Sequence, residues 1–263
     1  MFKKKSLGQH FLKADTYLRA VADAAEVGAG DTVLEIGPGE GALTRELLSR
    51  GAKVVAVEKD HRLVPMLGAT CDAKVAKGQL IIIEGDALEF EVASHIELKD
   101  EYKVVANIPY YITGALLRKF LTTPHQPSTL VFLVQKEVAE RVAKSKKESL
   151  LSLSIKAYGS PRYVKTVPSG AFSPPPEVDS AILLVSGISR ERFIDKIHEE
   201  KFFELIHAGF AKKRKMLRKN VETVLGKNTD EALIQAGIST HARAEDVALE
   251  KWLALANINL AKD

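Results

Sequence analysis

A polar segment that follows a largely apolar run carries the most distinctive chemistry of this sequence. Asn107, Ile108, Pro109 and Tyr110 come directly after residues 103–106, which indicate a buried strand. Asn107 offers a side-chain carbonyl. Ile108 offers a backbone carbonyl of restricted direction, because a residue before proline is confined to extended dihedral angles, and Pro109 has no competing N–H. Tyr110 adds an aromatic face that can stack on a flat ring for about 1–3 kcal/mol.

Two acceptors beside an aromatic face predict a pocket for a planar group that carries an NH2. The exocyclic amine of adenine or cytosine is such a group. The alternative interpretation is an ordinary strand end with a proline turn and a core tyrosine, and this segment alone does not decide between the two.

A glycine-rich turn forms a second candidate site. Gly37, Gly39 and Ala42 match the dinucleotide pattern G-x-G-x-x-G/A, and Glu58 lies 21 residues beyond Gly37, where an acid that binds ribose is expected. A nicotinamide-dependent dehydrogenase is therefore one alternative. Another alternative is that these residues bind no ligand and are ordinary turn glycines and acids at sheet edges.

The charges around this turn favour a cationic cofactor over a pyrophosphate. Pro38 removes a backbone donor from the turn, and Glu35 and Glu40 place negative charge beside it. S-adenosylmethionine combines adenosine with a positive sulfonium, and it suits these acids. We expect the glycines to admit its methionine moiety, Glu58 to accept both ribose hydroxyls, and Asp86, at the end of a later strand, to accept the adenine amine.

Alternating apolar patterns predict the fold. Strands are expected at residues 32–36, 53–57, 80–83, 103–107, 130–134, 163–167 and 181–185, with helices at 15–27, 42–50, 63–69, 113–121, 136–144 and 150–157. Asp15 is expected to cap the first helix, and residues 6–12 look too irregular for a regular element. The alternation predicts a doubly wound α/β sheet that binds ligands at the carboxyl ends of its strands.

The strand patterns stop near Ser189, which predicts two domains. Residues 1–188 would form the Rossmann-like domain with a basic N-terminal arm, and residues 189–263 a small α-helical domain. No run of about 18 apolar residues is present, so no membrane span is expected. The single cysteine, Cys71, and seven scattered histidines show no metal-ligand spacing. We expect a cytoplasmic protein without a metal site, and a monomer.

Basic residues gather in two clusters although the net charge is only +4. One cluster, near the start, contains Lys3, Lys4, Lys5 and Lys13. The other contains Lys212, Lys213, Arg214, Lys215, Arg218 and Lys219. Such clusters predict a polyanionic partner such as nucleic acid, and a solvated helix face is the alternative for either cluster alone.

Together these motifs resemble the ribosomal RNA adenine dimethyltransferase family, and most of all its bacterial small-subunit branch. The resemblance covers nearly the whole chain and rests on residues 8–12, 35–41, 58, 85–87, 107–110, 172–180 and 210–215. The sequence departs from the family at His10, where many relatives carry Asn, and at Lys212 and Lys213, where a Gln-Arg-type pair is common.

The resemblance implies a class I S-adenosylmethionine-dependent methyltransferase. His10 and Leu12 would help close the cofactor site alongside Gly37, Glu58, Asp86 and Asn107. The implied substrate is a pair of adjacent adenosines in the 3′-terminal hairpin loop of 16S rRNA, within the small ribosomal subunit or its precursor, each methylated twice on N6. Residues 212–219 would hold rRNA phosphates.

The expected mechanism is one of positioning. Asn107 Oδ1 and the Ile108 carbonyl would accept the two N–H groups of the adenine amine, while Tyr110 and Phe172 would cover its ring. Two further alternatives concern the function. The first is a mainly non-catalytic assembly factor of the small subunit, and the second is a resistance-type methyltransferase of large-subunit (23S) rRNA.

Overall fold

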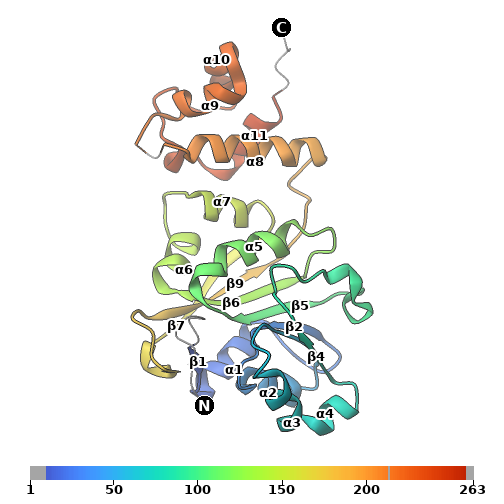
Figure 1. Cartoon of the computed structure of the whole chain (residues 1–263). Coiled ribbons are helices and arrows are strands. Elements are labelled where there is room, and N and C mark those ends of the chain that lie inside the picture. The colour runs from blue at the N-terminus through green and yellow to red at the C-terminus, as the bar shows by residue number, and fades with distance from the viewer. Residues whose placement is uncertain (1–9, 213, 259–263) are drawn as a thin grey trace. The chain divides into compact units, whose positions relative to one another are not determined.

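The computed structural model describes residues 10–212 and 214–258, and the chain divides into two compact units (Figure 1). The first unit contains residues 1–139 and 160–188, and the second contains residues 140–159 and 189–263. One boundary between the units follows residue 188. Residues 140–159, which we assigned to the first domain, group with the second unit. Their contacts explain this, because the Glu148 N–H donates to the Glu245 carbonyl at 2.8 Å and the Tyr158 ring stacks on Phe203.

One seven-stranded sheet organises the first unit, in the order β4-β3-β2-β5-β6-β9-β7. Its strands are β2 (Thr32–Ile36), β3 (Lys53–Glu58), β4 (Leu80–Glu84), β5 (Lys103–Asn107), β6 (Thr129–Gln135), β7 (Ser160–Val167) and β9 (Ser180–Ser186). Strands β2 to β6 are parallel, and β9 runs antiparallel to both β6 and β7. The predicted α/β sheet is confirmed. Its order reverses between β2 and β5, the position at which such sheets bind ligands.

Short helices accompany the strands of the first unit. They are α1 (Asp15–Ala24), α2 (Ala42–Ser49), α3 (Val64–Thr70), α4 (Asp72–Ala76), α5 (Thr113–Thr122), the start of α6 (Lys136–Ala143), and the 3₁₀ turns η2 (Val92–Ser94), η3 (Ile96–Leu98), η4 (Tyr110–Ile112) and η5 (Ser169–Ala171). One predicted cap is wrong. Ala14 is the N-cap of α1 and offers no capping side chain, while Asp15 is the first helical residue.

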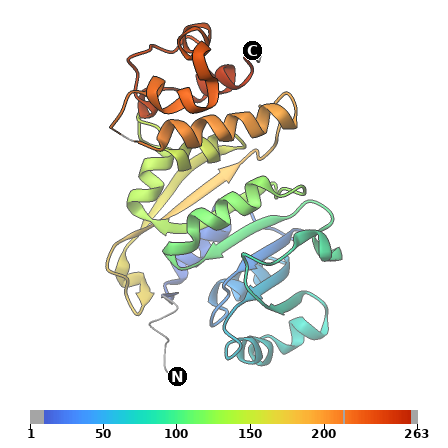
Figure 2. The ribbon, with the colours of Figure 1, turned by 45° about the horizontal axis from the view of Figure 1, so that its top comes forward.

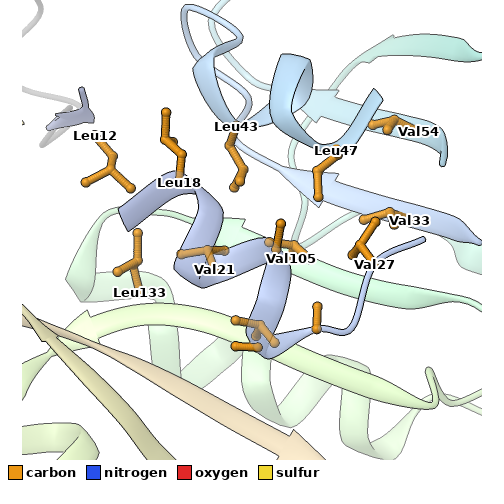
Figure 3. Packing of buried hydrophobic residues seen from close by; sticks show 14 of the residues in the cluster. Leu12, Leu18, Val21, Val27, Val33, Leu43, Leu47, Val54, Val105 and Leu133 are labelled. Carbon is orange, nitrogen blue, oxygen red and sulfur yellow. The ribbon is translucent and has the colours of Figure 1, made fainter. Parts of the chain in front are cut away.

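The core of the first unit packs α1 and α2 against one face of the sheet. Leu18 and Val21 of α1 and Leu47 of α2 lie against Val33 and Val105 of the strands, all at most 6% exposed (Figure 3). Because successive strand residues point to opposite faces, their buried neighbours Leu34 and Val104 face the other side. Helix α5 covers that side in Figures 1 and 2. A sheet buried on both faces explains why its strands are continuous apolar runs.

A second, two-stranded sheet joins segments far apart in the sequence. Strand β1 (Phe11–Leu12) pairs antiparallel with β8 (Phe172–Ser173), and the Lys13 N–H donates to the Ala171 carbonyl at 2.9 Å. We expected no regular structure at residues 11–12. Two residues are too few for a periodic pattern, and the partner strand is remote, so the sequence alone could not reveal the pairing.

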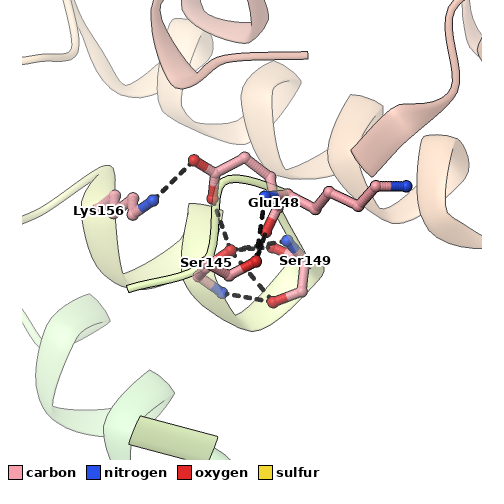
Figure 4. A network of polar contacts seen from close by, with 6 residues as sticks. Ser145, Glu148, Ser149 and Lys156 are labelled. Carbon is pink, nitrogen blue, oxygen red and sulfur yellow. Dashed lines mark hydrogen bonds and ion pairs between the residues drawn. The ribbon is translucent and has the colours of Figure 1, made fainter. Parts of the chain in front are cut away.

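The second unit is helical in the part of it that the structure describes. It contains α7 (Leu150–Lys156), α8 (Lys196–Phe210), α9 (Leu217–Leu225), α10 (Thr229–Gln235) and α11 (Leu249–Ala256), with the 3₁₀ turns η6 (Gly226–Asn228) and η7 (Ala244–Asp246). Figure 4 shows how α7 begins. The Ser149 side chain accepts from the Ser152 N–H at 3.1 Å, and Lys156 pairs with Glu148 at 2.7 Å.

Gly209 of α8 provides a test of packing in the second unit. A Cβ atom there would lie 2.4 Å from the buried ring of Trp252 and 3.0 Å from Leu217. We expect Gly209→Ala to lower the free energy of unfolding by about 1–3 kcal/mol, because an overpacked core must shift. Urea denaturation measures this.

Gly114→Ala is the matched control for that substitution. Gly114 also lies in a helix, and no atom lies within 4 Å of the added Cβ. Its unfolding free energy should stay the same or rise slightly. Equal destabilisation by both substitutions would contradict the packing that we describe.

Candidate active site

A pocket lies at the carboxyl ends of β2, β3, β4 and β5, within the first unit. Every residue that the sequence predicted to catalyse or to bind the cofactor lines it. These residues are His10, Leu12, Gly37, Gly39, Glu58, Asp86, Asn107, Ile108, Pro109, Tyr110 and Phe172. The structure thus brings together residues from six separate segments of the chain, in the way that the ends of parallel strands allow.

The glycine turn forms one wall of this pocket. Gly37 and Gly39 have φ angles of +68° and +59°, a region that side chains strongly disfavour. The Gly37 N–H donates to the Val57 carbonyl at 2.9 Å, which ties the turn to β3. A Cβ on Gly39 would lie 2.7 Å from the Phe11 ring. The turn therefore requires glycine at position 39 for two independent reasons, its backbone conformation and its close approach to Phe11.

The Glu58 carboxylate is fixed by backbone donors at the end of β3. Its Oε2 accepts from the Gly39 N–H at 3.0 Å, and its Oε1 accepts from the Asp60 N–H at 2.8 Å. Glu58 is only 6% exposed. Burial raises the pKa of Glu58, and the two backbone hydrogen bonds oppose that shift. A carboxylate held in this way presents its remaining lone pairs in a fixed direction.

Asp86 carries a partner that the sequence did not predict. The Lys59 ammonium donates to Asp86 Oδ2 at 2.6 Å, and the Leu88 N–H donates to Oδ1 at 2.9 Å. Lys59 lowers the pKa of Asp86 below its usual value, so this group is ionised at neutral pH. An ionised carboxylate at the pocket can still accept a further hydrogen bond, since each oxygen has a second lone pair.

Glu35 differs from our expectation of a negative charge beside the turn. Its side chain is 1% exposed, and burial raises the pKa of Glu35 to about 8. The nearby Thr44 hydroxyl opposes this shift, while the charge of Glu58 adds to it. Glu35 is therefore largely protonated at neutral pH. Its Oε2 has no hydrogen-bond partner among the described residues, so a buried polar atom that lines the pocket is left unsatisfied.

A hydrogen bond orients the Asn107 amide. Asn107 Nδ2 donates to the His10 carbonyl at 3.3 Å, which directs the amide oxygen away from His10. The His10 ring contacts the Pro174 carbonyl at 2.9 Å through Nδ1. Beside Asn107, Ile108 is 5% exposed. The N-terminal segment, the 172–176 loop and the end of β5 are thereby connected at one side of the pocket.

The two predicted aromatic residues have different surroundings. The hydroxyl of the half-buried Tyr110 lies 2.6 Å from Ser180 Oγ, and Ser180 is fully buried at the start of β9. Phe172 is 6% exposed and belongs to β8. Sequence reasoning assigned no role to Ser180 or to Tyr111, the next aromatic residue along the pocket. The position of Tyr111 directly after Tyr110 was the available signal.

The predicted basic cluster belongs to the second unit, whereas the residues that line the pocket belong to the first. Lys212, Arg214 and Lys215 are exposed in the loop between α8 and α9, and Lys219 is exposed on α9. Arg218 pairs with Asp230, so its charge is partly compensated. Lys213 and the basic residues 3–5 lie outside the described residues.

The described residues contain neither a membrane-spanning helix nor a cluster of metal ligands. None of the helices within residues 10–212 and 214–258 has the length and hydropathy needed to cross a membrane. No group of three or more metal-ligating side chains gathers there either.

Comparison with known proteins identifies the family. A profile of the family described as "Ribosomal RNA adenine dimethylase" matches residues 1–260. The chain belongs to the ribosomal RNA adenine dimethylase family. It is 42% identical, over 96% of its length and 87% of the relative, to ribosomal RNA small subunit methyltransferase A of Dehalococcoides mccartyi. It is 43% identical, over 96% of its length and 84% of the relative, to the protein of that name from Deinococcus radiodurans.

Solved structures support the same family and fold. The chain resembles a dimethyladenosine transferase from Plasmodium falciparum with a TM-score of 0.76 and 25% identity, over 94% of this chain and 96% of the other. It resembles the 23S rRNA methyltransferase ErmE with a TM-score of 0.74 and 26% identity, over 94% of this chain and 98% of the other. The sheet, its helices and these neighbours confirm a class I methyltransferase fold.

The buried Glu35 predicts a specific pH dependence of stability. The folded-state pKa of about 8 lies above the ordinary value of 4.5, so the native state binds more protons than the unfolded state between these values. The contribution of Glu35 is therefore fully present below about pH 4.5 and is lost as the pH rises to about 8, by at most about 1.4 kcal/mol for each pH unit.

Glu35→Gln should remove this loss, because the amide does not ionise. Urea denaturation between pH 5 and 8 should show a flatter profile for this variant than for the wild type. Glu84→Gln, which replaces an exposed carboxylate of the same sheet, should keep the wild-type slope. Parallel profiles for wild type and Glu35→Gln would show that Glu35 is ionised in the native protein.

Proposed function

We propose that this enzyme uses S-adenosylmethionine to methylate N6 of two adjacent adenosines in the 3′-terminal hairpin loop of 16S rRNA, giving N6,N6-dimethyladenosine in the small ribosomal subunit or its precursor. The observation that carries the proposal is the pocket itself. It joins a glycine turn, acids held by hydrogen bonds, and Asn107 and Ile108, the two residues proposed to supply carbonyl acceptors, in one place. A cytoplasmic site of action, where ribosomal subunits are available, is part of the proposal.

The residues of the pocket suit the cofactor. When bound, the cofactor supplies a methyl group on a positively charged sulfur. Glu58, oriented by the Gly39 and Asp60 N–H groups, would accept the ribose hydroxyls. Asp86 would accept the adenine amine. The unpaired Oε2 of Glu35 is a buried polar atom that a bound polar group would satisfy.

The N-terminal segment would close this cofactor site. The backbone of His10 and Leu12 passes beside the glycine turn, because Phe11 between them packs against Gly39. Leu12 is 2% exposed, so it contributes an apolar wall. This arrangement supports the part that the sequence resemblance assigned to both residues.

The chain would prepare the target amine by orienting it. The adenine amine is a poor nucleophile because its lone pair is delocalised into the ring. Asn107 Oδ1 and the Ile108 carbonyl would accept its two N–H groups and turn the lone pair out of conjugation, toward the methyl group. The bond from Asn107 Nδ2 to the His10 carbonyl supports this role, since it leaves the amide oxygen available.

Positioning carries most of the rate in this proposal. Aligned reactants at about 3–3.5 Å can recover on the order of 7–11 kcal/mol of the barrier. Tyr110, held by Ser180, and Phe172 would enclose the adenine ring. The methylated amine becomes an acidic ammonium and loses its proton to water, so no residue is assigned as a general base.

The relatives favour a small-subunit substrate over a large-subunit one. The identity to the small subunit methyltransferases A compared is 36–43%, whereas it is 26% to the 23S rRNA methyltransferase ErmE. The exposed cations of residues 212–219 would hold rRNA phosphates, and this contribution should weaken with salt. We propose that the protein acts as a monomer.

Asn107→Ala tests the proposed chemistry. The wild type, small subunits that lack the modification and methyl-labelled S-adenosylmethionine should give N6,N6-dimethyladenosine at two adjacent positions, detected by mass spectrometry. Asn107→Ala should lower the rate by about 100-fold or more, because one acceptor that aligns the amine is lost. Its binding to subunits should be unchanged.

Asn257→Ala, which removes an exposed asparagine of the second unit, is the control and should retain wild-type activity. Labelling of large subunits alone by the wild type would move the assignment to 23S rRNA. Tight binding without any labelling would favour the assembly-factor alternative.

Gly39→Ala tests the cofactor site separately. The substitution strains a positive φ and forces Phe11 to move, so S-adenosylmethionine should bind at least about 10-fold more weakly by calorimetry. Gly28→Ala alters a glycine that does not line the pocket, and no atom lies within 4 Å of its Cβ. It should bind the cofactor as the wild type does. Displacement of S-adenosylmethionine by NAD from the wild type would instead revive the dehydrogenase alternative.

A further inference from the structure

Tyr111 exposes its aromatic side chain at the pocket. It is 73% exposed, and it is the one aromatic residue among the large exposed hydrophobic residues of the described chain. It also lines the pocket that the predicted site residues line. A ring that stays in water contributes little to the core, so the fold gives no reason for an aromatic residue at this position.

Tyr110 and Tyr111 are adjacent, but their side chains point to different sides of the turn η4. The Tyr110 hydroxyl is hydrogen-bonded to the buried Ser180, which directs that side chain toward β9. Successive residues of a 3₁₀ helix point about 120° apart. The Tyr111 ring therefore leaves the turn in another direction, and its exposure shows that this direction is toward solvent.

A cationic side chain accompanies the exposed ring. The Lys59 ammonium is hydrogen-bonded to Asp86 at 2.6 Å, at the pocket that Tyr111 also lines. Lys59 is 65% exposed and lines the same pocket. An exposed aromatic face beside a basic side chain is the combination with which proteins hold single-stranded nucleic acid.

We propose that Tyr111 is the stacking platform for the nucleotide next to the adenosine that occupies the pocket. The proposal rests on the function proposed above and adds a second base-binding position to it. When an adenosine leaves its stack to enter the pocket, the neighbouring base loses a stacking partner. The Tyr111 ring at the pocket replaces that partner, and it would lower the cost of extruding the target base.

Methylation kinetics with small subunits test this platform. Tyr111→Ala should raise KM for subunits by about 5- to 150-fold, the range expected for loss of one stacked base. Tyr111→Phe keeps the ring and should stay within about threefold of the wild type. Tyr111→Leu keeps an apolar side chain without an aromatic face and should behave like Tyr111→Ala. The dissociation constant for S-adenosylmethionine and the melting temperature should not change in any of them.

Met66→Ala is the matched control, because Met66 is an exposed apolar residue of the same unit that does not line the pocket. It should leave KM unchanged. A wild-type KM in Tyr111→Ala would overturn the proposed platform. So would a KM in Tyr111→Leu that is as close to the wild-type value as that of Tyr111→Phe. Absence of methyl transfer by the wild type would instead overturn the proposed function, so the two failures are distinguishable.

Discussion

The register of three parallel strands determines where the chemistry of this protein lies. Ile36 of β2 is paired with Val57 of β3 and with Ala106 of β5, so the next residues, Gly37, Glu58 and Asn107, lie side by side at the carboxyl ends of these strands. The strand order reverses between β2 and β5. A shift of any of these strands by one residue relative to its neighbours would turn every side chain of that strand to the opposite face. The buried apolar residues on both faces of the sheet prevent such a slip, and they thereby also fix the site.

Burial and hydrogen-bond partners give the acids of the pocket different pKa values. Glu35 is enclosed by the core and is held largely protonated, whereas Asp86 lies beside Lys59 and stays ionised. The pKa of Glu58 is raised by burial, and two backbone N–H groups oppose that shift. The pocket is therefore less negative at neutral pH than its composition indicates. Its selectivity for a ligand rests on the direction of hydrogen-bonding groups as well as on charge.

Much of this arrangement could be predicted from the sequence, because it depends on local patterns. Strand β2 has its predicted bounds, and all predicted pocket residues meet in one place. Strand β7 begins at Ser160, earlier than the predicted residue 163, and includes Pro161, which an edge strand tolerates. The protonation of Glu35 depends on neighbours from other segments. The β1–β8 pair joins two short strands across more than half of the chain, and no local pattern records it.

The grouping of residues 140–159 with the second unit has a consequence for the modularity of the chain. The polypeptide passes from one unit to the other at three places, after residues 139, 159 and 188. Neither unit is a continuous segment, so a cut at residue 188 would not release an intact C-terminal domain. It would also leave Tyr158 without the Phe193 and Phe203 rings that surround it. Exchange of the helical unit between relatives therefore requires two segments to be transplanted together, and recombination at a single crossover would produce a mismatched interior.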